Sequence, residues 1–297
     1  MASNFSEDLA GATEKAGASV VTVRARSRVP SSGIYWRKGV IVTAEHTIRR
    51  DEEISILVSE GKKIPAKLAG RDPGTDVAIL KIEDETGLQT PQFADASSLK
   101  LAHSVLALGR TRTGNLAASA GIIGALGGAH RTWRGGQVDR SIRLSLELYP
   151  GFSGGPLLNT KGEVIGMNTA IGHGRPVTIP ASTVNRVVDE LLAKGYIARP
   201  YLGIAMQPVS LPENQREKLK AAVGLMVVHV ESAGPADKAG IVLGDVIVEL
   251  QGKPASEARG LMDSVASSHV GDSVNVKIIR AGERKEVLLT LGERPAQ

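Results

Sequence analysis

The chain has 297 residues and no cysteine, which excludes a disulfide, a thiol nucleophile and a thiolate metal site. Its apolar fraction of 42% is enough for packed cores, and because aromatic residues make up only 3%, these cores must consist mainly of Val, Ile, Leu and Ala. A net charge of +5 would attract polyanions, but the sequence has no nucleic-acid-binding motif and few stacking aromatics. We therefore interpret the arginine groups at 24–28 and 131–143 as solvated, and do not expect nucleic acid as a partner.

The first 18 residues are predicted to form a helix. Ser6 is placed to cap it, and an apolar face would carry Leu9, Ala12 and Ala16. The first residues show no basic segment followed by an apolar run, so no signal peptide is predicted, and no stretch is long enough to span a bilayer. From the residues alone we expect a cytoplasmic location.

From Ser19 onward, short β-branched runs are interrupted by Gly, Pro, Asp and Asn, a spacing typical of an all-β barrel or sandwich. The runs lie at 39–43, 54–58, 77–82, 104–108, 142–148 and 164–168. Residues 182–192 follow the helical period, and Gly195 is placed to cap that helix. Pro200 marks the expected joint to a second domain.

The second part of the chain, from about Arg199, mixes strands and helices. Strands are predicted at 225–230 and 244–250, helices at 232–241 and 258–267, and a final hairpin at 273–280 with 285–291. This pattern favours a small α+β domain.

One motif indicates chemistry: residues 151–156 read Gly-Phe-Ser-Gly-Gly-Pro. Glycines on both sides allow a tight turn that exposes Ser153, and the N–H groups of Gly151 and Ser153 would then bind an oxyanion. His46 ends an apolar run and Asp76 precedes another, so the chain order His, Asp, Ser is that of chymotrypsin. Taken singly, His46 and Asp76 are better interpreted as a solvated strand-end histidine and a turn former or N-cap, and Ser153 could be a turn serine; together the three predict a catalytic triad.

The motifs resemble those of the HtrA (DegP-like) serine proteases. Besides the triad segments, the resemblance rests on residues 105–110, 120–127, 157–169 and 199–204, and it covers about 10–295. It implies a mainly β chain: a chymotrypsin-like double β-barrel at 19–197, followed by an α+β PDZ domain at 199–295. Residues 1–18 would supply contacts for a homotrimer or larger oligomer, although Phe5 is their only aromatic.

The resemblance also implies a function, namely cleavage of unfolded or misfolded proteins. Ser153 would be the nucleophile, His46 the general base and Asp76 its orienting partner, with no metal or organic cofactor. Peptide C-termini or extended peptides would bind the PDZ domain at Tyr201, Leu202, Gly203 and Ile204. The family implies the cell envelope, which agrees with the sequence only if a preceding segment is missing.

Some positions depart from the family pattern. Phe152 stands where these proteases usually have Asn, and Ala44-Glu45 replaces the usual Asn-Asn before the histidine. The expected specificity-pocket wall, residues 171–180, is a poor match; His173 there would contact either substrate or solvent. Without an aspartate at the pocket base, cleavage after Lys or Arg is not expected. Phe152 and this wall motivate an alternative: a peptide-binding or chaperone-like scaffold with little proteolysis.

Overall fold

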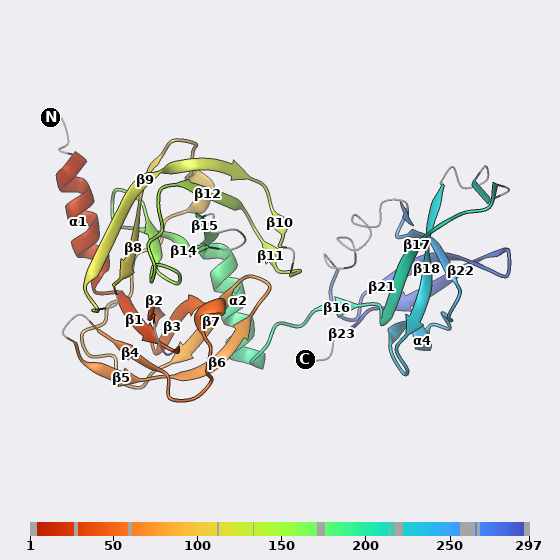
Figure 1. The fold of residues 1–297 in the computed structure, drawn as a ribbon, viewed down its shortest axis with the longest axis horizontal. Coiled ribbons are helices and arrows are strands. Elements are labelled where there is room, and N and C mark those ends of the chain that lie inside the picture. Colours follow the sequence, from red (N-terminus) through yellow and green to blue (C-terminus); the bar gives the residue numbers. More distant parts are fainter. Residues whose placement is uncertain are drawn as a thin grey trace. The chain divides into compact units, whose positions relative to one another are not determined.

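The computed structural model describes residues 5–26, 29–58, 61–111, 113–132, 134–170, 176–213, 215–216, 222–255, 265 and 268–293 (Figure 1). The chain divides into two compact units, Met1–Ile197 and Ala198–Gln297. Each unit has its own apolar core.

The first unit opens with helix α1 (Phe5–Gly17). Ala12 and Ala16 are buried and Leu9 packs against the same core, which confirms the predicted apolar face. The predicted cap is wrong, because the helix already includes Ser6. The buried face with Ala12 and Ala16 therefore holds this helix against the core.

The next seven strands form one antiparallel sheet in the order β5-β4-β1-β2-β3-β7-β6 (Figure 1). Their bounds are β1 Val20–Arg24, β2 Ser31–Arg37, β3 Val40–Ala44, β4 Ser55–Leu57, β5 Lys63–Pro65, β6 Lys67–Asp72 and β7 Val77–Lys81. One set of alternating side chains, including Val21, Ile41 and Leu80, fills the interior of this first barrel. The other set, including Val20, Val42 and Ile79, packs into a separate core.

The second barrel closes in the order β12-β15-β14-β13-β8-β9. Its strands are β8 Ser104–Arg110, β9 Leu116–Gly127, β12 Ser141–Ser145, β13 Pro156–Leu158, β14 Val164–Ala170 and β15 Pro176–Pro180. A small hairpin of β10 (His130–Arg131) and β11 (Gln137–Val138) lies between β9 and β12. The predicted strand at 142–148 is too long. Residues 146–148 alternate like a strand, but the chain leaves the sheet after Ser145 and approaches a turn at 149–152.

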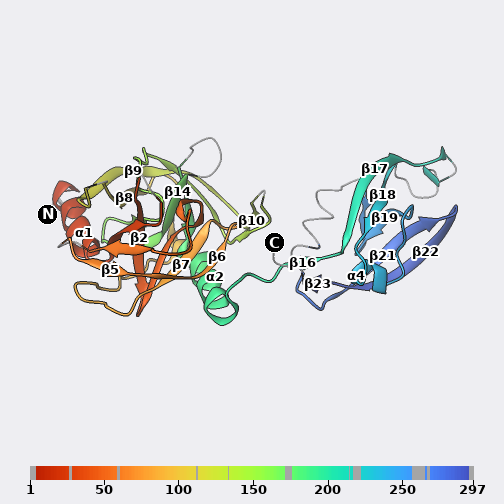
Figure 2. The same cartoon turned by 60° about the horizontal axis from the view of Figure 1, so that its bottom comes forward.

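Helix α2 (Ala181–Lys194) confirms the predicted periodicity and packs against β6, β7 and β14 (Figure 2). Gly195 adopts a left-handed conformation with φ 82°, and its N–H bonds to the carbonyl of Leu191, as expected for a glycine cap. The buried core beneath α2 takes side chains from both barrels, among them Val42 of β3 and Leu108 of β8. This shared core holds together the two barrels that carry the predicted site residues.

The second unit is a sheet in the order β17-β18-β19-β21-β22, with β20 paired to β19 and β16 paired to β23. The bounds are β16 Pro200–Tyr201, β17 Ile204–Ser210, β18 Val223–Val230, β19 Val246–Leu250, β20 Lys253–Pro254, β21 Ser273–Arg280, β22 Glu283–Thr290 and β23 Gly292–Glu293. The helix predicted at 232–241 is only α4 (Pro235–Lys238), because glycines at 234 and 240 limit it. The helix predicted at 258–267 lies outside the described residues except for Val265, which is buried. Among the described helices, none has the length and apolarity needed to cross a membrane.

Candidate active site

The pairing of β3 with β7 brings His46 and Asp76 together. In this antiparallel pair Ala44 lies opposite Val77, so the end of β3 meets the beginning of β7. His46 follows β3 in a short 3-10 helix, Glu45–Thr47, and Asp76 immediately precedes β7. Sheet register thus places two residues thirty positions apart next to each other.

The Asp76 carboxylate accepts hydrogen bonds from three donor groups. The backbone N–H of His46 donates to Oδ1 at 2.8 Å, and Nδ1 of the His46 ring lies 2.8 Å from Oδ2. Thr169, on β14 of the second barrel, donates its hydroxyl to Oδ2. A carboxylate only accepts, so Nδ1 carries the proton and Nε2 keeps its lone pair. The Asp76 side chain is 6% exposed and the imidazole 35% exposed, so the buried acid orients a ring that reaches solvent.

The turn before Asp76 is organised by a second buried aspartate, Asp72. Its carboxylate accepts the N–H groups of Gly74 and Thr75 and the hydroxyl of Thr75, at 3.0, 3.1 and 2.7 Å. Asp76 itself has a left-handed φ of 59°, a conformation that aspartate tolerates better than most residues. Sequence reasoning missed Asp72 and Thr169; only the Asp-Pro-Gly-Thr turn pattern at 72–75 gave a local signal.

Ser153 lies between the two barrels, next to the end of β3. The following residue, Gly154, is so closely packed that a Cβ there would lie 2.2 Å from the carbonyl oxygen of Ser32 and 2.9 Å from the nitrogen of Ala44. Gly154 also has φ 88°, and its N–H bonds to the carbonyl of Asn168. A glycine is required here by both space and backbone angle, and it sets Ser153 beside the segment that carries His46.

The residues before Ser153 form a type II turn. The N–H of Phe152 bonds to the carbonyl of Tyr149 at 3.0 Å, with Pro150 and Gly151 in the central positions. Gly151 has φ 103°, which a type I turn does not allow at that position. Proline followed by glycine is the pair that a type II turn favours, so the sequence itself selects the orientation of the Pro150–Gly151 peptide.

Between residues 151 and 155, two backbone N–H groups have no acceptor among the described residues. Those of Phe152, Gly154 and Gly155 bond to the carbonyls of Tyr149, Asn168 and Phe152. Within the described part of the chain, the N–H groups of Gly151 and Ser153 donate no hydrogen bond. Buried backbone donors are nearly always paired, so two free ones flanking a serine indicate a site for a bound anion.

Phe152 is a core residue of the second barrel. It is 1% exposed, and its ring meets that of Tyr149 edge to face at a centroid distance of 5.5 Å. A Cβ on Gly109 of β8 would lie 2.6 Å from Cδ1 of Phe152, so the missing side chain at 109 makes room for the ring. Phe152 therefore holds the loop before Ser153 in place by apolar packing. Phe152 is also the last residue of the type II turn.

His46 and Ser153 are not hydrogen-bonded: among the described residues, the His46 ring bonds to Asp76 alone. Such bonds often tighten only when substrate is bound. No cluster of three or more His, Asp or Glu side chains suited to a metal ion occurs among the described residues. His173 and Arg175 of the expected pocket wall lie outside them.

The predicted peptide-binding residues of the second unit lie at the start of its sheet. Tyr201 ends β16, and Ile204 begins β17, which is an edge strand. Between them, the carbonyl groups of Leu202 and Gly203 accept hydrogen bonds from Ala236 and Glu231, whereas their N–H groups donate none within the described residues. The loop is thus held by its carbonyls and presents free donors beside an open strand edge.

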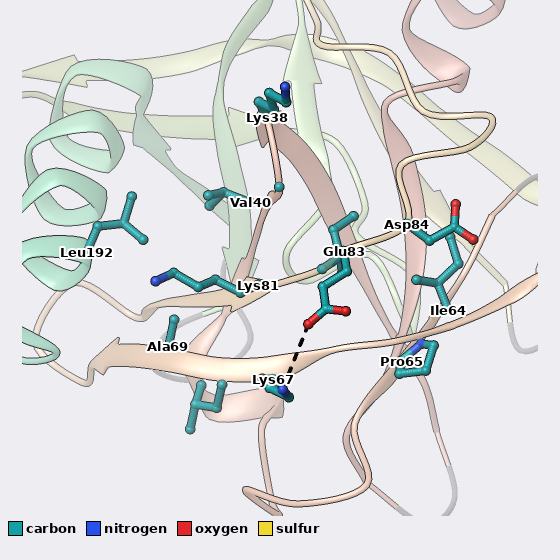
Figure 3. Close-up of a pocket in the computed structure, with 13 residues that line it drawn as sticks. Lys38, Val40, Ile64, Pro65, Lys67, Ala69, Lys81, Glu83, Asp84 and Leu192 are labelled. Atoms are coloured by element: carbon teal, nitrogen blue, oxygen red, sulfur yellow. Dashed lines mark ion pairs between the residues drawn. The ribbon is translucent and has the colours of Figure 1, made fainter.

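A groove on the first unit is separate from these sites. It is lined by residues of β3, β5, β6 and β7 and by Leu192 of α2 (Figure 3). Two of its carboxylates form ion pairs: Glu83 lies 4.0 Å from Lys67, another lining residue, and Asp84 lies 2.6 Å from Lys62, which does not line the groove. Because none of the predicted site residues lines it, we assign it no part in the chemistry.

Comparison with known proteins agrees with this architecture. A family model for the trypsin-like peptidase domain matches residues 31–167, and a model for the PDZ domain matches residues 200–291. The fold and the site thus define a trypsin-like peptidase domain joined to a PDZ domain.

The chain is HtrA-like, as its sequence motifs predicted. It is 34% identical over 280 residues to a probable periplasmic serine endoprotease DegP-like of Rhizobium meliloti, covering 92% of this chain and 55% of the relative. It is also 34% identical over 271 residues to a serine protease Do-like HtrA of Lactobacillus helveticus, covering 86% and 65%. The crystal structure of the serine endoprotease from Yersinia pestis aligns with a TM-score of 0.75 at 29% identity, over 99% of this chain and 100% of that one. The chain spans only about half to two thirds of the two curated relatives.

Proposed function

We propose that this chain is a serine endopeptidase whose catalytic triad is His46, Asp76 and Ser153. His46 Nε2 takes the proton of the Ser153 hydroxyl as that oxygen attacks the scissile carbonyl, and later gives it to the leaving amine. Asp76 holds the protonated Nδ1 at 2.8 Å and stabilises the imidazolium that forms. The similarity to proteins named as serine endoproteases supports this reading.

The observation that carries the proposal is the pair of free N–H groups at Gly151 and Ser153. When the carbonyl becomes tetrahedral, its oxygen gains negative charge, and two donors already in place stabilise that charge without reorganisation. Removal of one such donor typically lowers turnover about a hundred- to a thousand-fold. The φ of 103° at Gly151 keeps the turn in the form that leaves the Gly151 N–H unpaired.

The proposed substrates are unfolded or misfolded proteins, because a protease cleft takes an extended chain. In the second unit, the free N–H groups of Leu202 and Gly203 would bind a C-terminal carboxylate, while the peptide adds a strand to the edge of β17. Tyr201 and Ile204 flank this loop and complete the proposed peptide site. Proteins and peptides are therefore the proposed partners.

A homo-oligomer is also proposed, with contacts through α1. Phe5 at the start of that helix is 53% exposed, although burial of its ring would be favourable. Light scattering of the native chain and of Phe5→Ala tests this: a lower mass for the variant supports contacts through α1, and a monomeric native chain contradicts them.

The proposed activity is tested by hydrolysis of unfolded casein with the native chain and with Ser153→Ala. We expect cleavage by the native chain alone. Equal cleavage by both proteins would exclude Ser153 as the nucleophile. If neither cleaves, even with a C-terminal peptide added, the peptide-binding scaffold motivated by Phe152 becomes the better account.

A further inference from the structure

Ser32, on β2 of the first barrel, is completely buried and contacts the nucleophile loop of the second barrel. Its hydroxyl donates to the carbonyl of Gly151 at 2.7 Å, and its backbone N–H donates to the carbonyl of Ser153 at 3.1 Å. Gly151 and Ser153 are the two residues of the proposed oxyanion hole. In both residues the N–H is thus free, and the carbonyl accepts a hydrogen bond from Ser32.

The direction of the Ser32 hydroxyl is fixed by its neighbours. The N–H of Arg110 on β8 donates to Ser32 Oγ at 2.7 Å, so the hydroxyl hydrogen points to the carbonyl of Gly151. The peptide between Gly151 and Phe152 is then held at both ends, since its N–H bonds to the carbonyl of Tyr149. Rotation of this peptide would break two buried hydrogen bonds at once.

Both neighbours of Ser32 are anchored themselves. The Arg110 guanidinium is buried, which lowers its pKa, and it donates to the carbonyls of Val20, Gly17 and Gly114 at 2.9, 3.1 and 3.2 Å. On the other side, the hydroxyl of Thr43, three residues before His46, donates to the carbonyl of Ser32 at 2.7 Å. Ser32 therefore connects β3, the strand that precedes His46, with the loop that carries Ser153.

We propose that Ser32 is a positioning residue that sets the mutual orientation of the Gly151 and Ser153 N–H groups and so keeps the oxyanion hole assembled without bound substrate. It holds the peptide that follows each donor, which confines the backbone angles that aim the two N–H groups. This inference rests on the proposed function, because an oxyanion hole matters only to a working peptidase. It assigns to a first-barrel side chain a role in the second-barrel loop.

The test compares Ser32→Ala with Ser19→Ala in the full chain. Ser19 is a matched control: it is also buried, and its hydroxyl donates to a backbone carbonyl, that of Ala16, at 2.7 Å, but it does not contact the nucleophile loop. A second variant, Ser32→Cys, leaves a weaker donor on a somewhat larger atom at this position, and it replaces Ser32→Ala in the test if that variant does not fold. Steady-state cleavage of an unfolded protein is measured for each variant at a temperature where it is folded.

We expect kcat to fall about ten- to a hundred-fold in Ser32→Ala with KM little changed, because misplaced donors weaken only transition-state binding. Ser32→Cys should lie between it and the native chain, and Ser19→Ala should keep the native kcat. A native kcat in both Ser32 variants would overturn the proposal.

Failure of the proposed function is recognised separately, by a native chain that is itself inactive. In that case crystal structures of the native chain and of Ser32→Ala test the positioning role of Ser32. A turn at Tyr149–Phe152 that is unchanged without the hydroxyl contradicts the positioning role, and a displaced Gly151 carbonyl supports it.

Discussion

The carboxylate of Asp76 and the Nδ1 atom of His46 lie 2.8 Å apart, although thirty positions separate them in the chain. Their proximity follows from the register of β3 with β7, in which Ala44 faces Val77. The sheet thus brings the backbones of both residues together. Substitutions here should change chemistry with little effect on the fold.

Asp76→Asn should lower kcat about a thousand- to ten-thousand-fold. The amide NH₂ would face Nδ1 as a donor and favour the tautomer with its proton on Nε2, which cannot accept the serine proton. Asparagine tolerates the left-handed φ of 59°, so the backbone should stay in place. Thr169→Val, which removes one donor to the same carboxylate, is the graded control and should have a smaller effect. A native kcat in Asp76→Asn would show that His46 is not oriented by this residue.

Gly109→Ala should destabilise the first unit by about 1–3 kcal/mol, because the new methyl would lie 2.6 Å from the Phe152 ring. Since Phe152 adjoins Ser153, kcat should fall as well. Gly128→Ala is the control, as a Cβ there has open space. Thermal unfolding and casein cleavage measure the two effects.

The double variant Gly109→Ala, Phe152→Leu should recover part of the lost stability, since the smaller side chain makes room for the methyl. Additive losses in this double-mutant cycle would show that the two positions do not interact.

The buried ion pair between Asp245 and Arg280 should make the second unit sensitive to acid. Burial alone would raise the pKa of Asp245, but hydrogen bonds from Arg280 and from the N–H of Val242, with the charges of Arg280 and Lys285, bring it below its ordinary value. A lowered folded-state pKa stabilises the fold above the unfolded value of about 3.9, and that contribution disappears as pH falls through the folded value.

Asp245→Asn should therefore lower the free energy of unfolding near pH 7 by about 2–3 kcal/mol and remove this part of the pH dependence. The figure is below that of a fully buried pair because the Arg280 side chain is 32% exposed. Hydrogen exchange of β19 and β21 in the full chain, at pH 7 and near pH 3.5, measures it. Glu249→Gln, which breaks an exposed pair with Lys277, should have a much smaller effect. Equal effects of the two variants would contradict the assignment.

Gly203→Ala should weaken peptide binding by the second unit about tenfold or more. Gly203 has φ 75°, and a Cβ would lie 2.9 Å from Cδ of Pro235, so the loop that presents the free N–H groups must shift. Gly240→Ala is a matched control with φ 77° and open space around its Cβ. Fluorescence anisotropy with a peptide ending in an apolar residue, and with its C-terminally amidated form, reports the affinity. Binding that is indifferent to amidation would contradict carboxylate recognition at this loop.

Sequence patterns predicted much of this molecule because several determinants are local. The period of 182–192 identified α2, Gly195 identified its end, and the glycines around Ser153 identified a tight turn. The alternation of apolar and polar residues at 146–148 predicted a strand that is not there. Such a period does not indicate where the chain leaves a sheet, and β12 ends at Ser145.

The supporting residues could not be predicted because their partners are distant in the sequence. Thr169 meets Asp76 across 93 positions, and Ser32 meets Gly151 across 119. For a serine or threonine within a β-branched run, the sequence predicts a strand but not the distant residue that its hydroxyl contacts. The place of the Phe152 ring also depends on a residue distant in the sequence. The motif identified Phe152 as unusual, but its ring fits only because Gly109 has no Cβ.

The catalytic triad is tested by treating the native chain with a fluorophosphonate and locating the adduct by mass spectrometry. The reagent reacts with an activated serine, so we predict a single adduct on Ser153, strongly reduced in His46→Ala. A native chain that folds but takes no label, or takes it equally without His46, would contradict the triad.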